Sequence, residues 1–176
     1  MIPMIAERGF MPAGECRVLS RFLDGNVGRL GRENVEPFFS WRQIGYASVD
    51  CGRSRTIMDR ARQGIAALLR ERLHGGGRLY PEYTDLVLWR EGQGMNAHRD
   101  DLPPHFVHRL YSSILYLTEC EGGATVFPDL GIEVPPETGK MIAYPSSMAH
   151  GVRPVAAGTR HTLASWYTAE FGRREP

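Results

Sequence analysis

Long apolar stretches are missing from this chain of 176 residues. No run approaches the roughly 20 apolar residues that a membrane span needs, and the first ten residues lack the basic start and long apolar middle of a signal peptide. An excess of one charge is also missing, because 21 Lys and Arg residues stand against 20 Asp and Glu residues. We therefore expect neither a membrane nor a nucleic acid as a partner, and a cytoplasmic location follows by default.

Cysteine is scarce as well. Cys16, Cys51 and Cys120 are an odd number without C-x-x-C spacing, which argues against a disulfide framework and against a zinc–thiolate site. We expect reduced, structural cysteines. Repeats, low-complexity tracts and linkers are absent too, so a single domain over residues 1–176 is expected, with a core that buries about 70% of the unfolded surface.

The first 79 residues are predicted to be mainly helical support for the rest of the fold. Helices are expected over 12–23 and 56–73. In the second helix an apolar stripe at helical spacing includes Ile57 and Ile65, and the opposite, charged face includes Arg62. A run of three glycines then ends this helix. We expect the apolar stripe to pack against a sheet.

Residues 80–172 form the predicted β core. Runs rich in β-branched, aromatic and aliphatic residues alternate there with Gly and Pro, which is typical of short strands joined by turns. The best candidates for strands are 85–90, 111–118, 139–144 and 161–168. This spacing fits an antiparallel sandwich or a barrel, and the whole chain is then of the α+β class with a mainly β core.

A candidate metal site begins with His98 and Asp100. In an extended strand, side chains two residues apart point to the same face, so both can bind one ion. His150 is available to complete the site. Two imidazoles and one carboxylate that leave other positions open are typical of non-haem Fe(II) oxygenases. Taken alone, the short motif is more often part of a surface strand that carries polar residues.

Further motifs follow one another in a fixed order around this site. Residues 89–100 are similar to the pattern Tyr-x-x-Gly-Gln-x-Tyr-x-x-His-x-Asp, and 116–118 are similar to Tyr-Leu-Asn. Residues 121–128 match Glu-Gly-Gly-x-Thr-x-Phe-Pro, and the closing segments lie at 135–139 and 150–160. In these motifs the chain resembles the 2-oxoglutarate-dependent Fe(II) dioxygenases, specifically the prolyl 4-hydroxylase-like branch. The resemblance covers about half of the chain.

The resemblance implies a double-stranded β-helix (a jelly roll) with the metal at its open end. It implies that His98, Asp100 and His150 bind Fe(II) and form the catalytic centre. It also implies that 2-oxoglutarate binds as a co-substrate, with O2 as the oxidant and ascorbate as an additional reductant. A guanidinium is the expected partner for the far carboxylate of 2-oxoglutarate, because its fork pairs with both oxygens. Arg160 fits this role, with Tyr116 and Thr162 beside it.

The substrate wall is expected to differ from the family pattern. Strand alternation places Thr162, Ala164 and Trp166 on the same face as Arg160. The candidates for the wall are Trp89, Met95, Arg153 and Trp166. Trp89 and Met95 stand where the family has tyrosines, so its peptidyl-proline specificity does not transfer directly. The expected reaction is hydroxylation of an unactivated C–H bond in an amino-acid-like or prolyl-type substrate, either a small molecule or a peptidyl residue.

Two other classes of protein share parts of this pattern. A non-catalytic jelly-roll binding protein would explain the β-rich half but not the ordered metal and arginine motifs. A metal-dependent hydrolase could hold zinc with the same two histidines and one aspartate, and would activate a water molecule on it. No pattern in the sequence specifies the oligomeric state.

Overall fold

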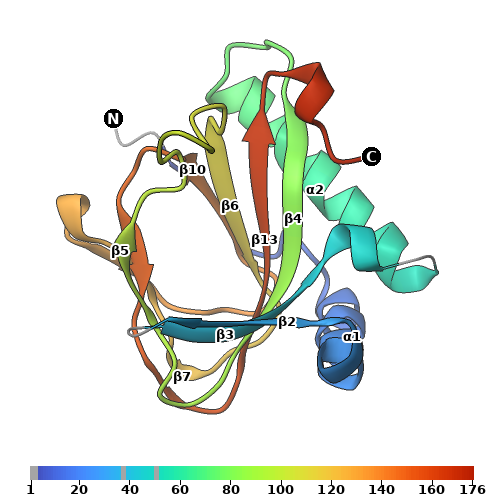
Figure 1. Cartoon of the computed structure of the whole chain (residues 1–176), viewed down its shortest axis with the longest axis vertical. Helices are drawn as coiled ribbons and strands as arrows, with labels where there is room; N and C mark the ends of the chain where they lie inside the picture. The colour runs from blue at the N-terminus through green and yellow to red at the C-terminus, as the bar shows by residue number, and fades with distance from the viewer. Residues whose placement is uncertain (1–3, 37–38, 50–51) are drawn as a thin grey trace.

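Two facing antiparallel sheets form the body of the protein, which a computed structural model describes over residues 4–36, 39–49 and 52–176 (Figure 1). The larger sheet has the order β1 (Ile5–Glu7), β10 (Met141–Pro145), β6 (Tyr111–Tyr116), β13 (Arg160–Thr168), β4 (Tyr80–Trp89), β3 (Phe39–Gly45) and β2 (Arg32–Glu36). The smaller sheet has the order β5 (Met95–His98), β11 (His150–Val152), β8 (Thr125–Phe127) and β9 (Ile132–Val134). Two short strands, β12 (Val155–Ala157) and β7 (Glu121–Gly122), pair separately.

Two helices, α1 (Ala13–Leu30) and α2 (Arg53–Arg72), cover the outer face of the larger sheet (Figure 1). Short 3-10 turns lie at Tyr46–Ser48, Pro128–Leu130 and Phe171–Arg173. The main hydrophobic core fills the space between the helices and the sheet, where Leu19 and Leu69 meet Leu86 and Leu163. The inner face of the same sheet therefore faces a second, smaller interior, which lies between the two sheets. The predicted α+β class with a mainly β core and supporting helices is confirmed.

The helices differ from the sequence prediction in their ends. α1 begins near the predicted position but continues to Leu30, well past the expected end at residue 23. The physical reason is that Val27 extends the buried stripe of Leu19 and Leu23 by one more turn. α2 begins three residues earlier than predicted, at Arg53, and ends at Arg72. Beyond it Gly75 and Gly76 have positive φ angles of 60° and 81°, which explains why the glycine run ends the helix.

The first 79 residues, predicted to be mainly helical, contain the strands β1, β2 and β3 besides the two helices. β1 pairs with β10, and the hairpin of β2 and β3 extends the larger sheet beyond β4. This hairpin has no clear signal in the sequence because β2 carries charged residues at an edge position, where only one side of a strand needs a partner. The strands predicted over 85–90, 111–118, 139–144 and 161–168 correspond to β4, β6, β10 and β13.

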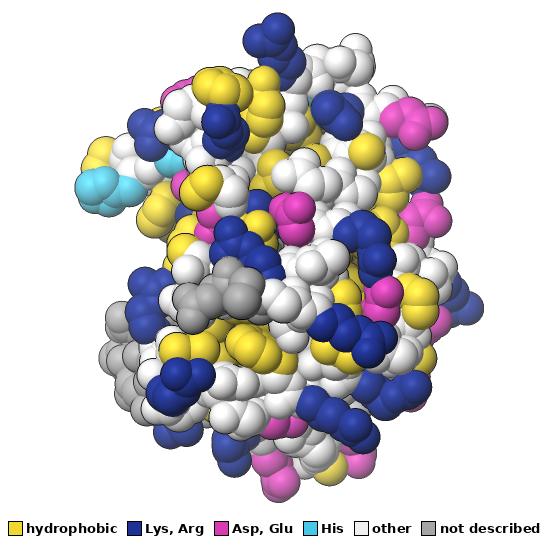
Figure 2. All heavy atoms as spheres, turned by 90° about the vertical axis from the view of Figure 1, so that its right-hand side faces the viewer, with side chains coloured by type: hydrophobic (Ala, Val, Ile, Leu, Met, Phe, Trp, Pro, Cys, Tyr) yellow, Lys and Arg dark blue, Asp and Glu magenta, His cyan; other side chains and the backbone are white. Residues whose placement is uncertain are grey.

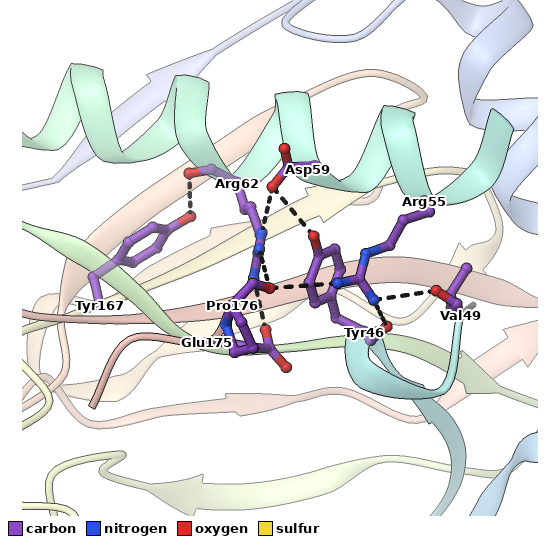
Figure 3. Close-up of polar contacts among 8 residues, drawn as sticks. All are labelled: Tyr46, Val49, Arg55, Asp59, Arg62, Tyr167, Glu175 and Pro176. Carbon is purple, nitrogen blue, oxygen red and sulfur yellow. Dashed lines mark hydrogen bonds and ion pairs between the residues drawn. The ribbon is translucent and has the colours of Figure 1, made fainter. Parts of the chain in front are cut away.

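Arg62 corrects a second expectation, because it is buried rather than part of an exposed charged face. Its guanidinium contacts Asp59 at 3.0 Å, Glu175 at 2.9 Å and the carbonyl oxygen of Pro176 at 3.0 Å. It also lies 3.5 Å from the centre of the Tyr46 ring. Figure 3 shows Arg62 on one side of this ring and Arg55 on the other. These contacts fasten the last residues to α2.

The helix-bearing side of the molecule presents charges of both signs. Lys and Arg side chains are spread over this side, with Asp and Glu between them (Figure 2). This distribution agrees with the net charge of +1. In the part of the chain that the structure describes, no helix combines the length and the apolar character needed to cross a membrane.

Candidate metal centre and co-substrate cavity

The two histidines of the candidate metal site face each other across the smaller sheet. His98 is the last residue of β5, His150 is the first residue of β11, and the two are paired directly in the antiparallel register. Their ring centres are 4.5 Å apart. Asp100 lies two residues beyond the end of β5, where its backbone N–H donates to the Ser146 carbonyl at 2.9 Å. The three side chains therefore meet as predicted, although Asp100 is outside the strand.

The ligand atoms of the three residues lie within 4.8 Å of one another. His98 Nε2 is 3.4 Å from Asp100 Oδ1, and His150 Nε2 is 3.5 Å from Asp100 Oδ2. The other ring nitrogen of each histidine contacts a backbone carbonyl, Asn96 O at 3.0 Å and Met148 O at 3.1 Å. A proton on Nδ1 satisfies these carbonyls and leaves the Nε2 lone pairs free for a metal. This donor set fits Fe(II).

Asp100 is held in place from its other side. Ser112, on the inner face of β6, donates to Asp100 Oδ2 at 2.7 Å and lies 2.8 Å from the Ser146 hydroxyl. Burial acts to raise the pKa of Asp100, but the hydrogen bonds from His98 and Ser112 outweigh it and hold that pKa well below the ordinary value. Asp100 is therefore anionic throughout the physiological range.

The two histidines titrate differently. Burial lowers the pKa of His150, against the opposing charge of Asp100. Burial also acts to lower the pKa of His98, but the hydrogen bond and charge of Asp100 outweigh it and raise that pKa. His150 is consequently neutral and ready to bind a metal, whereas protonation of His98 competes with the metal as the pH falls.

A cavity of about 110 Å³ connects this centre with the interior of the larger sheet. Its lining includes all three metal-site residues together with Arg160, Thr162 and Trp166. The alternation predicted for the last strand is confirmed, since Arg160, Thr162, Ala164 and Trp166 all line it. A larger and more exposed hollow of about 540 Å³ lies next to it and shares Met95 and Val152 with its lining.

Arg160 lies deep in the cavity with 1% of its surface exposed. Its Nη2 donates to the Thr125 hydroxyl at 3.1 Å, whereas Nε has no hydrogen-bond partner among the described residues. Among those residues no carboxylate forms an ion pair with it either. Burial lowers the pKa of Arg160. A buried cation without a counter-ion is costly, so the geometry fits an anionic ligand such as the far carboxylate of 2-oxoglutarate.

Two neutral donors stand beside Arg160. Tyr116 is fully buried, and its hydroxyl lies 2.6 Å from Thr125 Oγ1. The Arg160 guanidinium is 5.3 Å from the centre of the Tyr116 ring. Thr162, predicted as a further contact, lines the cavity one step along β13. Their roles toward 2-oxoglutarate stay predictions.

The residues predicted for the substrate wall do not all lie together. Trp89, Met95 and Trp166 line the cavity. Arg153 does not line it; its side chain is 60% exposed, pairs with Glu133 at 2.6 Å and borders the larger hollow. Any contact between Arg153 and a substrate would therefore have to form outside the cavity.

Sequence reasoning missed three residues of this site: Ser112, Thr125 and Tyr144. Ser112 lies on the same face as Ile114 and Tyr116, so strand alternation could have found it. Thr125 lies inside the motif 121–128, and Tyr144 ends a predicted strand. Tyr144 packs against His150 with 4.8 Å between ring centres, and burial raises its pKa well above the ordinary value. It is a neutral wall for the metal centre.

Comparison with known proteins agrees with this geometry. The profile of the 2OG-Fe(II) oxygenase superfamily matches residues 82–168. Prolyl 3-hydroxylase 2 of Gallus gallus is 29% identical over 126 residues, which cover 55% of this chain and 18% of that protein. Prolyl 3-hydroxylase 1 of Gallus gallus is 38% identical over 76 residues, which cover 39% of this chain and 10% of that protein. The chain therefore matches less than a fifth of the length of these relatives.

Solved structures show the same fold at low sequence identity. A Pseudomonas putida prolyl-4-hydroxylase has a TM-score of 0.77 and 20% identity, covering 100% of this chain and 95% of that chain. A prolyl hydroxylase from Trichoplax adhaerens, solved with a hypoxia inducible factor peptide fragment, has a TM-score of 0.78 and 14% identity, covering 97% and 86%. The predicted double-stranded β-helix is thus confirmed. The matching profile, the relatives and the metal-site geometry together identify the chain as a member of the 2OG-Fe(II) oxygenase superfamily, similar to the prolyl hydroxylases.

Proposed function

We propose that the protein is a 2-oxoglutarate-dependent Fe(II) dioxygenase that hydroxylates an unactivated C–H bond of an amino-acid-like, prolyl-type substrate. One observation carries the proposal. A single cavity is lined by His98, Asp100 and His150 and also by Arg160, a buried guanidinium that forms no ion pair within the described part of the chain. A metal alone would not require the guanidinium. A keto acid that binds the metal at one end and carries a carboxylate at the other would require both.

When bound, Fe(II), 2-oxoglutarate and O2 supply the oxidising chemistry, in which 2-oxoglutarate loses CO2 to give succinate and one oxygen atom enters the substrate C–H bond. The protein residues do little acid–base work. His98, Asp100 and His150 hold the metal on one side and leave the other positions open. Arg160 fixes the direction of the keto acid. Tyr144, Trp89 and Val152 keep water away from the reacting atoms, since they are buried around the cavity.

The volume of the cavity indicates that only part of the substrate enters it. Its volume of about 110 Å³ is well below the roughly 300–1,000 Å³ of sites that enclose whole ligands. Beside the metal centre the loop between β5 and β6 exposes Leu102, Phe106 and Val107, at 51%, 41% and 61%. A residue presented on a peptide would fit this arrangement, and the relatives are prolyl hydroxylases.

Neither alternative class has an observation in its favour. A non-catalytic jelly roll has no use for three converging metal ligands beside a buried arginine that has no counter-ion among the described residues. A zinc hydrolase needs only the metal and its water, so Arg160 would stay buried without a counter-ion. Cys16 and Cys120 are free thiols, in keeping with the cytoplasmic location predicted from the sequence. That location, like the use of ascorbate as a reductant, belongs to the proposal.

The decisive test is an assay of coupled products. The protein is incubated with Fe(II), 2-oxoglutarate, ¹⁸O2 and a library of proline-containing peptides, and both succinate and the peptide masses are measured. We expect a peptide that gains one ¹⁸O atom and succinate in equal amount. Asp100→Ala, which removes the carboxylate ligand, should give neither. Wild-type protein that binds Fe(II) and 2-oxoglutarate but yields no succinate with or without peptide would contradict the proposal.

A further inference from the structure

A further hollow borders the metal centre on the side of the loop between β5 and β6. It has a volume of about 270 Å³, and its lining includes the metal-site residues His98 and Asp100, which also line the cavity. We call this space the loop hollow. Consecutive Cα atoms are only about 3.8 Å apart. A substrate residue whose carbon lies at the metal centre would therefore place its chain neighbour beside the loop hollow.

The loop supplies an apolar wall to this hollow. Leu102, Pro103 and Phe106 line it, and the exposed side chains of Val107 and Leu110 continue the apolar surface along the same loop. Four of the six exposed large hydrophobic side chains in the described part of the chain therefore lie in this one loop. A cluster of exposed apolar side chains at the entrance of a site is typical of a binding surface.

Glu82, on β4, holds this wall in position. Its Oε1 lies 3.1 Å from His108 Nε2, and its Oε2 accepts from Arg109 Nε at 2.9 Å. The Arg109 guanidinium in turn lies 4.1 Å from the centre of the Phe106 ring and 4.8 Å from that of Trp166, which lines the cavity. The apolar wall is therefore fastened to the larger sheet and formed before a ligand arrives.

The charged residues around the loop hollow include one cation without a partner. Asp100 belongs to the metal site, and Arg109 is paired with Glu82. Arg99 stands between two metal-site residues in the chain, is exposed and lines the hollow. It forms no hydrogen bond or ion pair within the described part of the chain. His105, which also lines the hollow, brings no negative charge. The charge of Arg99 is thus available to a ligand.

We propose that the loop hollow is a substrate subsite for an acidic residue next to the hydroxylated residue of a peptide. The methylene groups of a glutamate would lie on Leu102 and Phe106, and its carboxylate would accept from the Arg99 guanidinium. A lysine in the same position would oppose the charge of Arg99. The inference rests on the proposed function and adds a charge preference to it.

The test uses tetrapeptides blocked at both ends that place glutamate, glutamine or lysine directly before or directly after proline. Glutamate and glutamine match in size and differ in charge. The peptides are titrated by calorimetry into the intact protein, loaded with Fe(II) and 2-oxoglutarate without oxygen. In one of the two placements the glutamate peptide should bind about threefold to tenfold more tightly than the glutamine peptide, and the lysine peptide should bind most weakly. Salt at about 0.5 M should reduce these differences.

Charge reversal separates a contact with Arg99 from a general attraction between the protein and acidic peptides. Arg99→Glu should reverse the order, so that the lysine peptide binds more tightly than the glutamate peptide, and Arg99→Gln should remove the preference. Arg70→Glu is the matched control, because Arg70 is exposed on α2, which covers the outer face of the larger sheet. The same change in net charge there should leave the wild-type order.

Several results would decide against the subsite. Equal affinity for the glutamate and glutamine peptides in both placements would overturn it, as would an absence of binding by both. An unchanged order of affinities in Arg99→Glu would show that the preference arises elsewhere. If wild type fails to bind 2-oxoglutarate itself, the proposed function fails and the subsite falls with it. The two kinds of failure are distinguishable, because iron and 2-oxoglutarate are titrated into each protein before any peptide is added.

Discussion

At the scale of single residues, Arg160 has the least ordinary environment in the site. A guanidinium with 1% exposure usually meets a carboxylate, yet here it bonds to neutral hydroxyls, those of Thr125 and Tyr116. Arg160 points into the cavity because residues two apart on β13 share a face, and Thr162 and Ala164 lie on that face with it. Burying this charge costs free energy, which a bound anion offsets. The cavity is therefore preorganised for an acidic ligand.

Replacing Arg160 by Ala should weaken 2-oxoglutarate binding strongly. Loss of a buried, charge-assisted pair costs on the order of 2–5 kcal/mol, which is roughly 30-fold to several thousand-fold in affinity. Arg160→Lys should recover only part of this, because an ammonium keeps the charge but loses the fork. The measurement is a titration of 2-oxoglutarate into oxygen-free, iron-loaded protein, followed by the metal-to-ligand charge-transfer band.

Iron affinity is the control for this pair of variants, since Arg160 is not among the three clustered ligands. It should stay within about twofold of wild type. Arg153→Ala is the matched arginine control, because that side chain is 60% exposed and pairs with Glu133. Equal 2-oxoglutarate affinity in wild type and Arg160→Ala would place the carboxylate anchor elsewhere.

Asp85 should make the stability of the protein depend on pH. Its pKa in the folded protein, about 7, lies above the ordinary value of 3.8 because of burial. The stabilising contribution of its protonated form is therefore complete below about pH 4 and is lost as the pH rises towards 7. Asp85→Asn does not titrate, so across this window it should gain up to about 4 kcal/mol relative to wild type. Urea denaturation at pH 4, 5.5 and 7 measures this difference, and a constant difference would contradict the prediction.

At the scale of elements, β13 shows which parts of the structure the sequence predicts well. Its residues alternate between the cavity and the main core, so Arg160 and Thr162 face inward while Leu163 joins the helix-side cluster. A strand that is buried on both faces shows no strict polar–apolar alternation, so β13 was predicted from its β-branched, aromatic and aliphatic residues and the turn formers around it. The same composition located β6 and β10, and the family motif pointed to Tyr116.

The smaller sheet was not predictable in this way. β8, β9 and β11 have three residues each, which is too short to show any period. His98 and His150 were found through their ligand chemistry, the spacing of His98 and Asp100 in an extended backbone and the family motifs, not through a periodic pattern in their strands. The hydrogen bond between Ser112 and Asp100 joins β6 of the larger sheet to the bend after β5 of the smaller sheet. A contact between residues of two different sheets leaves no pattern in a single sequence.

Within α2, Arg62 should contribute far more to stability than its exposed neighbour Arg60. Arg62→Ala removes the partner of the nearly buried Glu175 and the stack on Tyr46, and the free energy of unfolding should fall by about 3 kcal/mol. Arg60→Ala is the matched control; Arg60 is 61% exposed in its pair with Glu15, so the loss should stay below about 1 kcal/mol. Urea denaturation compares the two variants. Similar losses would mean that the contacts of Figure 3 carry little energy.

At the scale of the whole molecule, the hydrophobic core and the metal centre are separate. The main core lies between the helices and the outer face of the larger sheet, where Leu19, Ile65 and Leu86 pack. The metal centre lies on the other side of that sheet, at the end of the smaller one. The fold therefore supports the site, while the site contributes little to the fold.

Removing the metal or one ligand should consequently abolish binding without unfolding the protein. In small zinc domains the metal supplies the folding energy, and chelation unfolds them. Here the core is complete without it, so EDTA-treated protein and His150→Ala should both unfold in one cooperative transition. The metal adds only its binding free energy, about 2.7 kcal/mol at a hundredfold excess over Kd.

Near-UV circular dichroism and urea denaturation, measured beside iron binding and 2-oxoglutarate consumption, test this prediction of a metal-independent fold. His150→Ala that still consumed 2-oxoglutarate at the wild-type rate would refute the metal assignment, and loss of the cooperative transition on chelation would show that the metal is part of the fold.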